Sequence, residues 1–235
     1  MRTVQELFAN AAQVSVIIPT LNAAGTLSGL AEQLRVSVLV REIIVVDGGS
    51  SDDSVAVARA AGARIIEAAR GRGLQLATGA SVASGNWLLF LHADCRLEPD
   101  WEAAVRAFLS ALPAGSRAGY FDFAIDDVGS AARRLERIVT WRCRVLALPY
   151  GDQGLLIARS LYRAVGGFAP IPLMEDVDIV RRLGRRRLAR IGTRCVSSPR
   201  RYRCEGYRRR SLRNLVCLLL YFAGVPPQRI VRLYG

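Results

Sequence analysis

Val14-Ser-Val-Ile-Ile18 gives the clearest indication of the fold, because four of its five residues are β-branched and it ends at Pro19-Thr20. A short apolar run of this kind is typical of a buried strand. Over residues 27–34, apolar residues then recur at i, i+3, i+4 and i+7, which indicates a helix with one apolar face. Glu42-Ile-Ile-Val-Val46 predicts the next strand, so the chain begins as strand, helix, strand.

The same alternation continues to about residue 110. Strands are expected at Arg64-Ile-Ile66 and Trp87-Leu-Leu-Phe-Leu91, with helices at about 52–61, 73–83 and from Trp101 onward. This order predicts an α/β fold, in which helices flank a mostly parallel sheet on both faces. Ligands of such sheets bind beyond the carboxyl ends of the strands. Three polar segments lie at those ends: Pro19-Thr20, Asp47-Gly-Gly-Ser50 and His92-Ala-Asp94.

The second half of the chain is less regular. Strands are expected at about 119–123 and 155–157, and helices at about 138–148, 174–183 and 208–222. No internal repeat or linker divides the sequence, and 235 residues suffice for one sizeable core. We therefore expect a single domain over residues 1–235.

Charge is distributed unevenly along the chain. The formal net charge is +13, and the sequence has no Lys, so Arg supplies all of the positive charge. Residues 1–130 hold 10 Arg and 14 acidic residues, a net −4, whereas residues 131–235 hold 23 Arg and 6 acidic residues, a net +17. This asymmetry indicates an anionic partner for the second half: nucleic acid, phosphate groups or a lipid surface.

Cysteine usage and hydrophobicity bear on location. The 5 Cys are scattered without a C-x-x-C pair, which is typical of a reducing compartment and argues against a zinc site. No secretion signal is apparent at the start of the sequence. The longest apolar run, Leu215–Val225, would form a helix only about 16 Å long, against a hydrocarbon core of about 30 Å. We therefore expect a cytoplasmic protein.

Two glycine-containing segments in the first half suit a nucleotide. Asp47-Gly-Gly-Ser-Ser-Asp52 follows the second strand, where glycine lets a ligand approach the backbone and a carboxylate can bind a base or ribose. Gly71-Arg-Gly73 precedes a helix with Gln75 in its first turn, an arrangement that suits a phosphate. The alternative for the first segment is a capped turn, and for the second it is an ordinary loop. Neither G-x-G-x-x-G nor a Walker lysine is present, so a dinucleotide-binding fold or a P-loop is not supported.

Two acidic segments have spacings that suit chemistry. His92 and Asp94 are two residues apart, so on an extended segment both side chains point to the same side and can share a divalent ion. Glu175-Asp176 stands beside Asp178, and repulsion among neighbouring carboxylates can raise one pKa towards that of a general base. The alternatives are a structural histidine and acidic residues that interact with a helix dipole.

The last Arg cluster leads into a segment that turns apolar by Phe222. One interpretation is docking to an anionic membrane, with Arg208, Arg209, Arg210 and Arg213 at the headgroups and an apolar face in the acyl boundary. The other is a helix that packs on the sheet or on a second copy of the chain, as in a homodimer. No nucleic-acid-binding motif accompanies the charge, so nucleic acid is not the expected partner.

Beyond these patterns, the sequence resembles glycosyltransferase family 2 over nearly its whole length, and more narrowly the small bacterial transferase 2 subgroup associated with radical-SAM/selenodomain proteins. The resemblance rests on Val14-Ser-Val-Ile-Ile-Pro-Thr-Leu-Asn22, Phe90-Leu-His-Ala-Asp94, Tyr150-Gly-Asp-Gln-Gly154 and Gly166-Gly-Phe-Ala-Pro-Ile-Pro-Leu-Met-Glu-Asp176. It implies the Rossmann-like GT-A fold, with a nucleotide-binding half (about 12–110), an acceptor and catalytic half (about 111–205) and a C-terminal helical segment (about 206–235).

The resemblance also implies roles for individual residues. Binding of the nucleotide sugar falls on Pro19, Thr20, Asn22, Asp47, Gly49, Gly71, Arg72, Gln75 and Ala93. The family's D-x-D metal motif falls on His92-Ala93-Asp94, so the first carboxylate is missing and the expected metal ligands are Asp94 and His92. The family's Glu-Asp pair falls on Glu175 and Asp176, with Asp176 as the base. The acceptor and the diphosphate would meet Asp152, Gln153, Arg201 and Tyr202.

Two departures from the family pattern bear on specificity. Ala23 follows Asn22 where the family often has Glu, so the identity of the nucleotide stays open. The Q/R-x-x-R-W motif of processive members survives only as Ser198-Pro-Arg-Arg201-Tyr202, which favours single addition.

The sequence thus predicts an enzyme that transfers a sugar from a nucleotide-diphosphate sugar to an acceptor hydroxyl with inversion, assisted by Mg²⁺ or Mn²⁺. The acceptor is unidentified. Docking at the inner face of the cell membrane would favour a lipid, carotenoid or polyprenyl-phosphate acceptor. The competing hypotheses are a nucleotide- or RNA-binding module without catalysis and an inactive relative.

Overall fold

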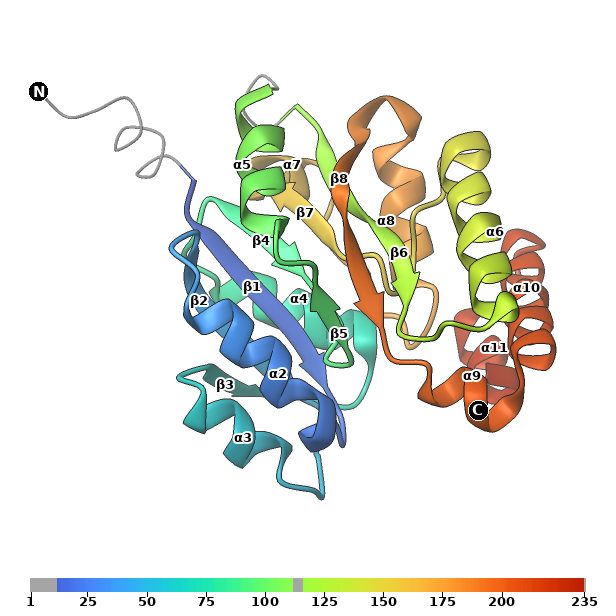
Figure 1. Ribbon diagram of the computed structural model, residues 1–235, viewed down its shortest axis with the longest axis horizontal. Helices are drawn as coiled ribbons and strands as arrows, with labels where there is room; N and C mark the ends of the chain where they lie inside the picture. Colours follow the sequence, from blue (N-terminus) through green and yellow to red (C-terminus); the bar gives the residue numbers. More distant parts are fainter. Residues whose placement is uncertain (1–11, 112–115, 235) are drawn as a thin grey trace, which may run out of the picture.

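The structure is a computed structural model, which describes residues 12–111 and 116–234. In that part of the chain eight strands form one sheet, with helices on both faces (Figure 1). The strands are β1 (Val14–Thr20), β2 (Val40–Asp47), β3 (Arg64–Glu67), β4 (Trp87–Phe90), β5 (Cys95–Leu97), β6 (Ala118–Ile125), β7 (Leu155–Ala158) and β8 (Leu188–Ser197). The helices are α2 (Ala24–Arg35), α3 (Ser54–Ala60), α4 (Arg72–Val82), α5 (Trp101–Ala111), α6 (Ser130–Leu146), α7 (Arg159–Ala164), α8 (Glu175–Leu183), α9 (Arg200–Glu205), α10 (Tyr207–Phe222) and α11 (Pro227–Tyr234), with one 3-10 turn, η1 (Arg185–Arg187).

The sheet has the strand order β3-β2-β1-β4-β7-β6-β8-β5. Strands β3, β2, β1 and β4 are parallel to one another, and so are β6 and β8. Strand β7 lies antiparallel between β4 and β6, and β5 pairs antiparallel with β8 at the edge. The predicted α/β fold with a mostly parallel sheet is confirmed, and it contains one reversed strand near its middle.

Strand β1 contributes to two apolar cores, one on each face of the sheet. Successive side chains of a strand point to opposite faces. Val14, Val16 and Ile18 join the core that includes α2 and α5, while Ile17 joins the core that includes α4 and α8. All four are 0% exposed, and a strand buried on both faces needs apolar residues at nearly every position.

The reversal of β7 positions the polar residues of two distant segments. Phe90, the last residue of β4, pairs with Leu155, the first residue of β7. The turn after β4 and the loop before β7 therefore lie side by side, at the edge where β1 and β2 also end. Gly154 has φ +64°, and a Cβ there would lie 2.9 Å from Leu91 Cδ2, so glycine allows the loop to approach β4 this closely.

The C-terminal helices pack beside the start of α8. Leu173, Met174 and Val177 form one apolar cluster with Cys217 of α10 and Ile230 of α11. The helix expected at about 208–222, which is α10, therefore packs on the segment that leads into Glu175-Asp176 and on α11, at the right of Figure 1. Among the residues described, no helix is both long and apolar enough to cross a membrane.

The predicted placement of four Arg of α10 at a membrane surface needs correction. Arg208 and Arg209 are exposed. Arg210, however, is only 5% exposed and donates a hydrogen bond to Glu205 over 3.0 Å. Arg213 also pairs with Glu205. Because a buried guanidinium needs a hydrogen-bonded partner, Arg210 serves the packing of α9 and α10, and the half-buried Arg213 shares the same partner.

Candidate functional site

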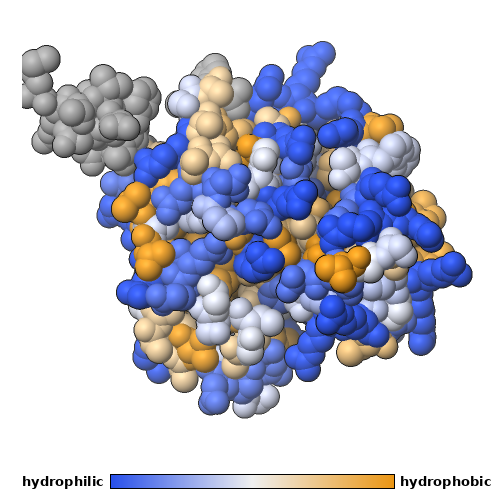
Figure 2. Space-filling model, viewed as in Figure 1, coloured by the Kyte–Doolittle hydropathy of each residue, from blue (hydrophilic) through white to orange (hydrophobic). Residues whose placement is uncertain are grey.

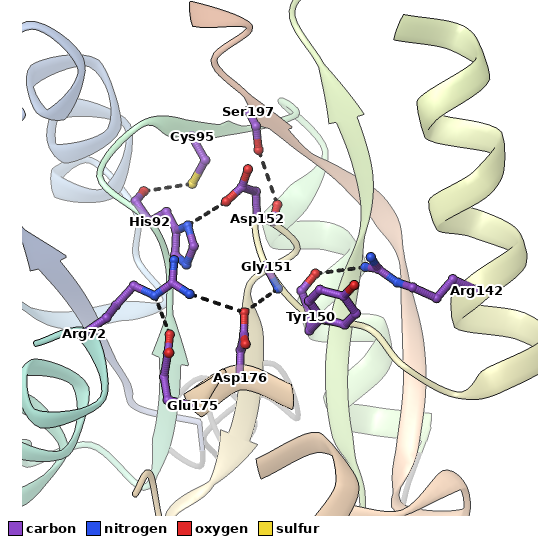
Figure 3. Close-up of polar contacts among 10 residues, drawn as sticks. All are labelled: Arg72, His92, Cys95, Arg142, Tyr150, Gly151, Asp152, Glu175, Asp176 and Ser197. Atoms are coloured by element: carbon purple, nitrogen blue, oxygen red, sulfur yellow. Dashed lines mark hydrogen bonds and ion pairs between the residues drawn. The ribbon is translucent and has the colours of Figure 1, made fainter. Parts of the chain in front are cut away.

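Charged residues from four segments converge where β1, β2 and β4 end and β7 begins (Figure 3). They are Arg72 at the start of α4, His92 and Asp94 after β4, Asp152 before β7, and Glu175 and Asp176 at the start of α8. His92, Glu175 and Asp176 line one cavity, which brings the two acidic segments of the sequence to the same place. That they act together stays a prediction.

Arg72 links the two acidic residues of α8. Its Nε donates to Glu175 Oε1, and its Nη2 lies 3.7 Å from Asp176 Oδ2. Asp176 Oδ2 also accepts a hydrogen bond of 2.7 Å from the Gly151 backbone N–H. Glu175 is 0% exposed, and this burial raises its pKa although Arg72 opposes the shift. The raised pKa therefore belongs to Glu175, with burial rather than repulsion as its main cause.

His92, Asp94 and Asp152 form a cluster whose potential ligand atoms all lie within 4.8 Å of one another. His92 Nδ1 lies 2.7 Å from Asp152 Oδ1. His92 and Asp94 were expected on an extended segment, which is wrong: the segment is a turn, closed by a hydrogen bond of 3.4 Å from the Cys95 N–H to the His92 carbonyl. The turn nevertheless brings the two side chains to the same place.

The two carboxyl groups of this cluster have opposite pKa shifts. Burial raises the pKa of Asp94, and the negative charge of Asp152 raises it further. Burial would also raise the pKa of Asp152, but the hydrogen bond and charge of His92, with Arg72 and Arg201 nearby, hold it well below its usual range. For His92, burial lowers the pKa, yet the bond to Asp152 outweighs it and the net direction is upward.

Two residues predicted to bind the nucleotide organise the loops at the ends of β1 and β2. The Asp47 carboxylate accepts hydrogen bonds from the backbone N–H groups of Gly49 (3.0 Å) and Ser50 (2.9 Å). The Gln75 amide donates to the carbonyls of Thr20 (3.0 Å) and Val46 (2.8 Å). These side chains therefore hold the ends of β1 and β2 in place, and their role towards a nucleotide stays a prediction.

The other predicted nucleotide residues line the same edge. Asn22 has φ +50°, and its side-chain oxygen accepts a hydrogen bond of 2.8 Å from the Ser51 N–H. Pro19 and Thr20 end β1, and Gly71 precedes α4 with φ +153°. Ala93 is 7% exposed and its side chain joins the apolar core, so only its backbone can meet a ligand.

The four residues predicted to meet the acceptor and the diphosphate separate into different roles. Gln153 is 2% exposed, and its amide donates to the Phe121 carbonyl and accepts from Arg142, so it is committed to the core. Tyr202 stacks on Tyr207 with ring centroids 5.1 Å apart. Arg201 is exposed, and its charge acts on Asp94 and Asp152. Asp152 belongs with His92.

Arg142 is a residue of this region that the sequence did not indicate. Its guanidinium lies 3.6 Å from the centroid of the Tyr150 ring and donates to the Tyr150 carbonyl over 3.0 Å. It thereby fixes the start of the loop that carries Asp152. No motif distinguishes Arg142 among the many Arg of this chain, so only the folded structure reveals the contact.

Comparison with known proteins agrees with this architecture. The PGL/p-HBAD biosynthesis glycosyltransferase of Mycobacterium tuberculosis is 38% identical over 104 residues, and the same match is found in Mycobacterium bovis. The match covers 40% of this chain and 41% of the relative, so the chain spans about two fifths of the length of the curated relatives it matches.

Solved structures extend the similarity to nearly the whole chain. A crystal structure of a mycobacterial protein has a TM-score of 0.65 at 25% identity, covering 96% of this chain and 80% of that protein. Glucosyl-3-phosphoglycerate synthase from Mycobacterium tuberculosis, solved with Mn²⁺, UDP and glucosyl-3-phosphoglycerate, has a TM-score of 0.64 at 21% identity, covering 96% and 85%. At this identity the second likeness concerns the fold alone.

The family model of glycosyl transferase family 2 matches residues 15–170, which include β1 to β7 and the His92–Asp152 cluster. That match covers more than half of the sequence and agrees with the motifs noted in it. The chain therefore belongs to glycosyl transferase family 2.

Proposed function

We propose that this protein transfers a sugar from a nucleotide-diphosphate sugar to an acceptor hydroxyl, with inversion at the anomeric carbon and a single addition. The observation that carries the proposal is the position of Asp176, a carboxylate held by the Gly151 N–H and linked through Arg72 to Glu175. The cluster of His92, Asp94 and Asp152 lies nearby, so a base and a diphosphate site can face one sugar.

The donor set of the cluster fits a divalent cation. Two carboxylates and one imidazole lie within 4.8 Å, and Mg²⁺ and Mn²⁺ prefer oxygen ligands with room for substrate phosphates. Asp94 would hold the ion together with the His92–Asp152 pair. When bound, the ion supplies positive charge to the leaving diphosphate. The Mn²⁺ and UDP in the solved mycobacterial synthase support this assignment.

The side chains then have distinct tasks. Asp176 accepts the proton of the acceptor hydroxyl while the hydroxyl oxygen forms a bond to the anomeric carbon. The bond between that carbon and the diphosphate oxygen breaks on the opposite face, and the nucleoside diphosphate leaves. Arg72, from the N-terminus of α4, and Arg201 would stabilise the negative charge that develops there.

The test begins with a panel of nucleotide sugars, scored by release of nucleoside diphosphate with Mg²⁺ or Mn²⁺. For the active donor, Asp176→Asn should lower turnover by roughly 10²–10⁴-fold, because a positioned base contributes about that much. The matched control is Asp178→Asn on the same helix, whose carboxylate bonds Arg182 instead. Wild-type turnover in Asp176→Asn would overturn the assignment, and retention of anomeric configuration in the product, by NMR, would overturn inversion.

The rival hypotheses give different results in the same experiments. A binding module without catalysis would bind nucleoside diphosphate or RNA and release no product from any donor. Tight RNA binding that weakens steeply with salt, without binding of UDP or GDP in the presence of Mn²⁺, would favour an RNA-binding module. An inactive relative would bind neither a donor nor the ion.

A second proposal is peripheral binding to an anionic membrane with a lipid-linked acceptor. It is supported by five side chains on one face of α10 that are 41% to 62% exposed: Leu212, Leu215, Val216, Leu219 and Phe222. Helix α6 adds exposed Ile138, Trp141 and Val145, and Figure 2 shows hydrophobic residues scattered among hydrophilic ones on the side where these helices lie. Exposed apolar patches rimmed by polar groups mark interaction surfaces.

Co-sedimentation with vesicles of graded anionic lipid content tests the membrane proposal. Changing Arg208 and Arg209 together to Gln should weaken binding roughly 30-fold, at about 1 kcal/mol per Arg. Changing exposed Arg59 and Arg117 to Gln removes the same charge far from α10 along the chain and should have less effect. Equal effects of the two pairs, or binding that does not rise with anionic lipid, would contradict docking through α10.

A further inference from the structure

The most informative cluster of the molecule is the one formed by the turn after β4 and the loop before β7. Asp94 and Asp152 are far apart in sequence, yet the antiparallel pairing of Phe90 with Leu155 places their backbones together. The loop is held firmly: Gly154 packs against Leu91, and the Ser197 hydroxyl donates to the Asp152 carbonyl over 3.5 Å. Both carboxylates are therefore positioned before any ligand arrives.

The hydrogen bond between His92 and Asp152 separates the roles of the three side chains. Nδ1 of His92 is 2.7 Å from Asp152 Oδ1. A carboxylate can only accept hydrogen bonds, so Nδ1 carries the proton and its lone pair is not free for a cation. The second oxygen of Asp152 stays available. Asp94 accepts no hydrogen bond from the side chain of another residue within 12–111 or 116–234, so its carboxylate is available too.

We propose that Asp152 is the second carboxylate ligand of the divalent cation, with Asp94 as the first, and that His92 is a positioning residue which orients Asp152. The inference rests on the proposed function and names the ligands of its cation. Asp152 thereby supplies, from a different loop, the negative charge that position 92 lacks. Hydrogen bonds that orient a ligating carboxylate in this way are a common second layer around bound metals.

The distances are compatible with a small hard cation. Two oxygens that bind one Mg²⁺ at about 2.1 Å can be at most about 4.2 Å apart. The potential ligand atoms of the cluster lie within 4.8 Å, so a small rotation of one carboxylate suffices. A cation would also add positive charge between the partly buried Asp94 and Asp152, which repel each other, beside the charges of His92 and Arg201 that already act on both.

Binding of Mn²⁺ to the full chain, measured from the EPR signal of free Mn²⁺ with and without UDP, tests this assignment without any turnover. Asp152→Asn should weaken Mn²⁺ binding by at least about tenfold. His92→Asn keeps an N–H donor near the position of Nδ1 and should retain binding, whereas His92→Leu should lose it. Asp126→Asn, which alters a carboxylate 69% exposed and outside the cluster, is the matched control.

A double variant keeps the proposal falsifiable if the single ones are unstable. His92→Asp combined with Asp152→Asn moves the carboxylate to position 92, and it should bind Mn²⁺ more tightly than Asp152→Asn alone. Wild-type affinity in Asp152→Asn would overturn the role of Asp152 and leave the proposed transfer intact. Equal loss in His92→Asn and His92→Leu would make His92 a ligand and overturn its positioning role. No Mn²⁺ binding by the wild type, with or without UDP, would overturn both the metal assistance and this inference.

Discussion

Glu175 is fully buried, and its oxygen Oε2 has no hydrogen-bond partner among the residues described. Its other oxygen accepts the Arg72 Nε–H, which fixes the guanidinium against α8. An ionised carboxylate with a free buried oxygen is costly, which is the physical reason for the raised pKa of Glu175. Glu175 therefore holds Arg72 through an interaction whose strength depends on whether Glu175 is ionised.

The raised pKa of Glu175 makes stability depend on pH. Below its ordinary value of 4.5 the group is protonated in both folded and unfolded chains. As the pH rises, the unfolded chain releases the proton first, so the folded state loses stability until Glu175 ionises there as well. Each unit of difference between the two pKa values corresponds to about 1.4 kcal/mol.

Glu175→Gln removes this titration and keeps an acceptor for Arg72. In urea unfolding between about pH 4 and 8, the free energy of unfolding of the variant minus that of the wild type should rise with pH. Other titrating groups, such as Asp94, are present in both proteins and cancel in the difference. Parallel profiles for the two proteins would contradict the shift.

Several residues of the site could be predicted from the sequence, and the pairing within it could not. Asp94 and Glu175-Asp176 stand in recognisable local motifs, so the sequence alone places them at strand or helix ends. The His92–Asp152 bond depends on β7 lying antiparallel beside β4, which no local pattern encodes. Gln75 and Gln153 look like ligand residues in the sequence. Only the folded chain shows that their amides are buried and donate to backbone carbonyls.

Among the elements, α4 has a glycine, Gly73, that suggests ligand binding in the sequence but that packing alone explains. Gly73 is in the first turn of α4, and its backbone N–H donates to the Ile171 carbonyl over 3.3 Å. A Cβ at this position would lie 2.3 Å from the Ala169 carbonyl oxygen and 2.6 Å from that of Ile171. Glycine is therefore required for α4 to approach the segment before α8, a sufficient reason for the Gly71-Arg-Gly73 pattern.

Two glycine substitutions should have opposite effects on stability. Gly73→Ala should lower the free energy of unfolding by about 1–3 kcal/mol, because the neighbouring atoms are backbone and must shift. Gly29→Ala in the middle of α2, where a Cβ meets nothing within 4 Å, should raise it by about 0.5–1 kcal/mol. Urea unfolding of both variants measures this, and a loss of stability in Gly29→Ala equal to that in Gly73→Ala would refute the packing argument.

Strand β8 is the longest of the elements that sequence inspection overlooked, the others being β5, α7, α9 and α11. It follows the run Arg185–Arg187 and carries Arg190 and Arg194, so the segment resembles a basic loop. In the structure Ile191, Thr193 and Cys195 are buried while the residues between them are exposed, an alternation that was available as a signal. Because charged residues occupy the exposed face of β8, the alternation of buried and exposed positions is missed when the segment is judged by its composition.

For the whole molecule, the reactivity of the cysteine thiols shows whether the apolar cores exclude solvent and reagents. All 5 Cys are free, and Cys204 alone among them is exposed. A thiol reagent should therefore modify one Cys rapidly in the native protein and the rest only in denaturant, since exchange with buried thiols requires opening. Cys204→Ser should remove the rapid phase. A second rapid thiol in that variant would show that one of the cores is open in solution.

The reversed strand β7 has a consequence for the order in which the chain folds. Strands β1 to β4 are complete by Phe90, whereas Asp152 reaches Asp94 only after β7 has entered between β4 and β6. Val14 pairs with Trp87 and Phe90 pairs with Leu155, so both pairings close long loops, which is slow compared with local pairing. A chain that folds during synthesis would thus form β1 to β4 before β7 has been made and would gain the ability to capture a cation only with β7, so Mn²⁺ uptake would report the entry of that strand.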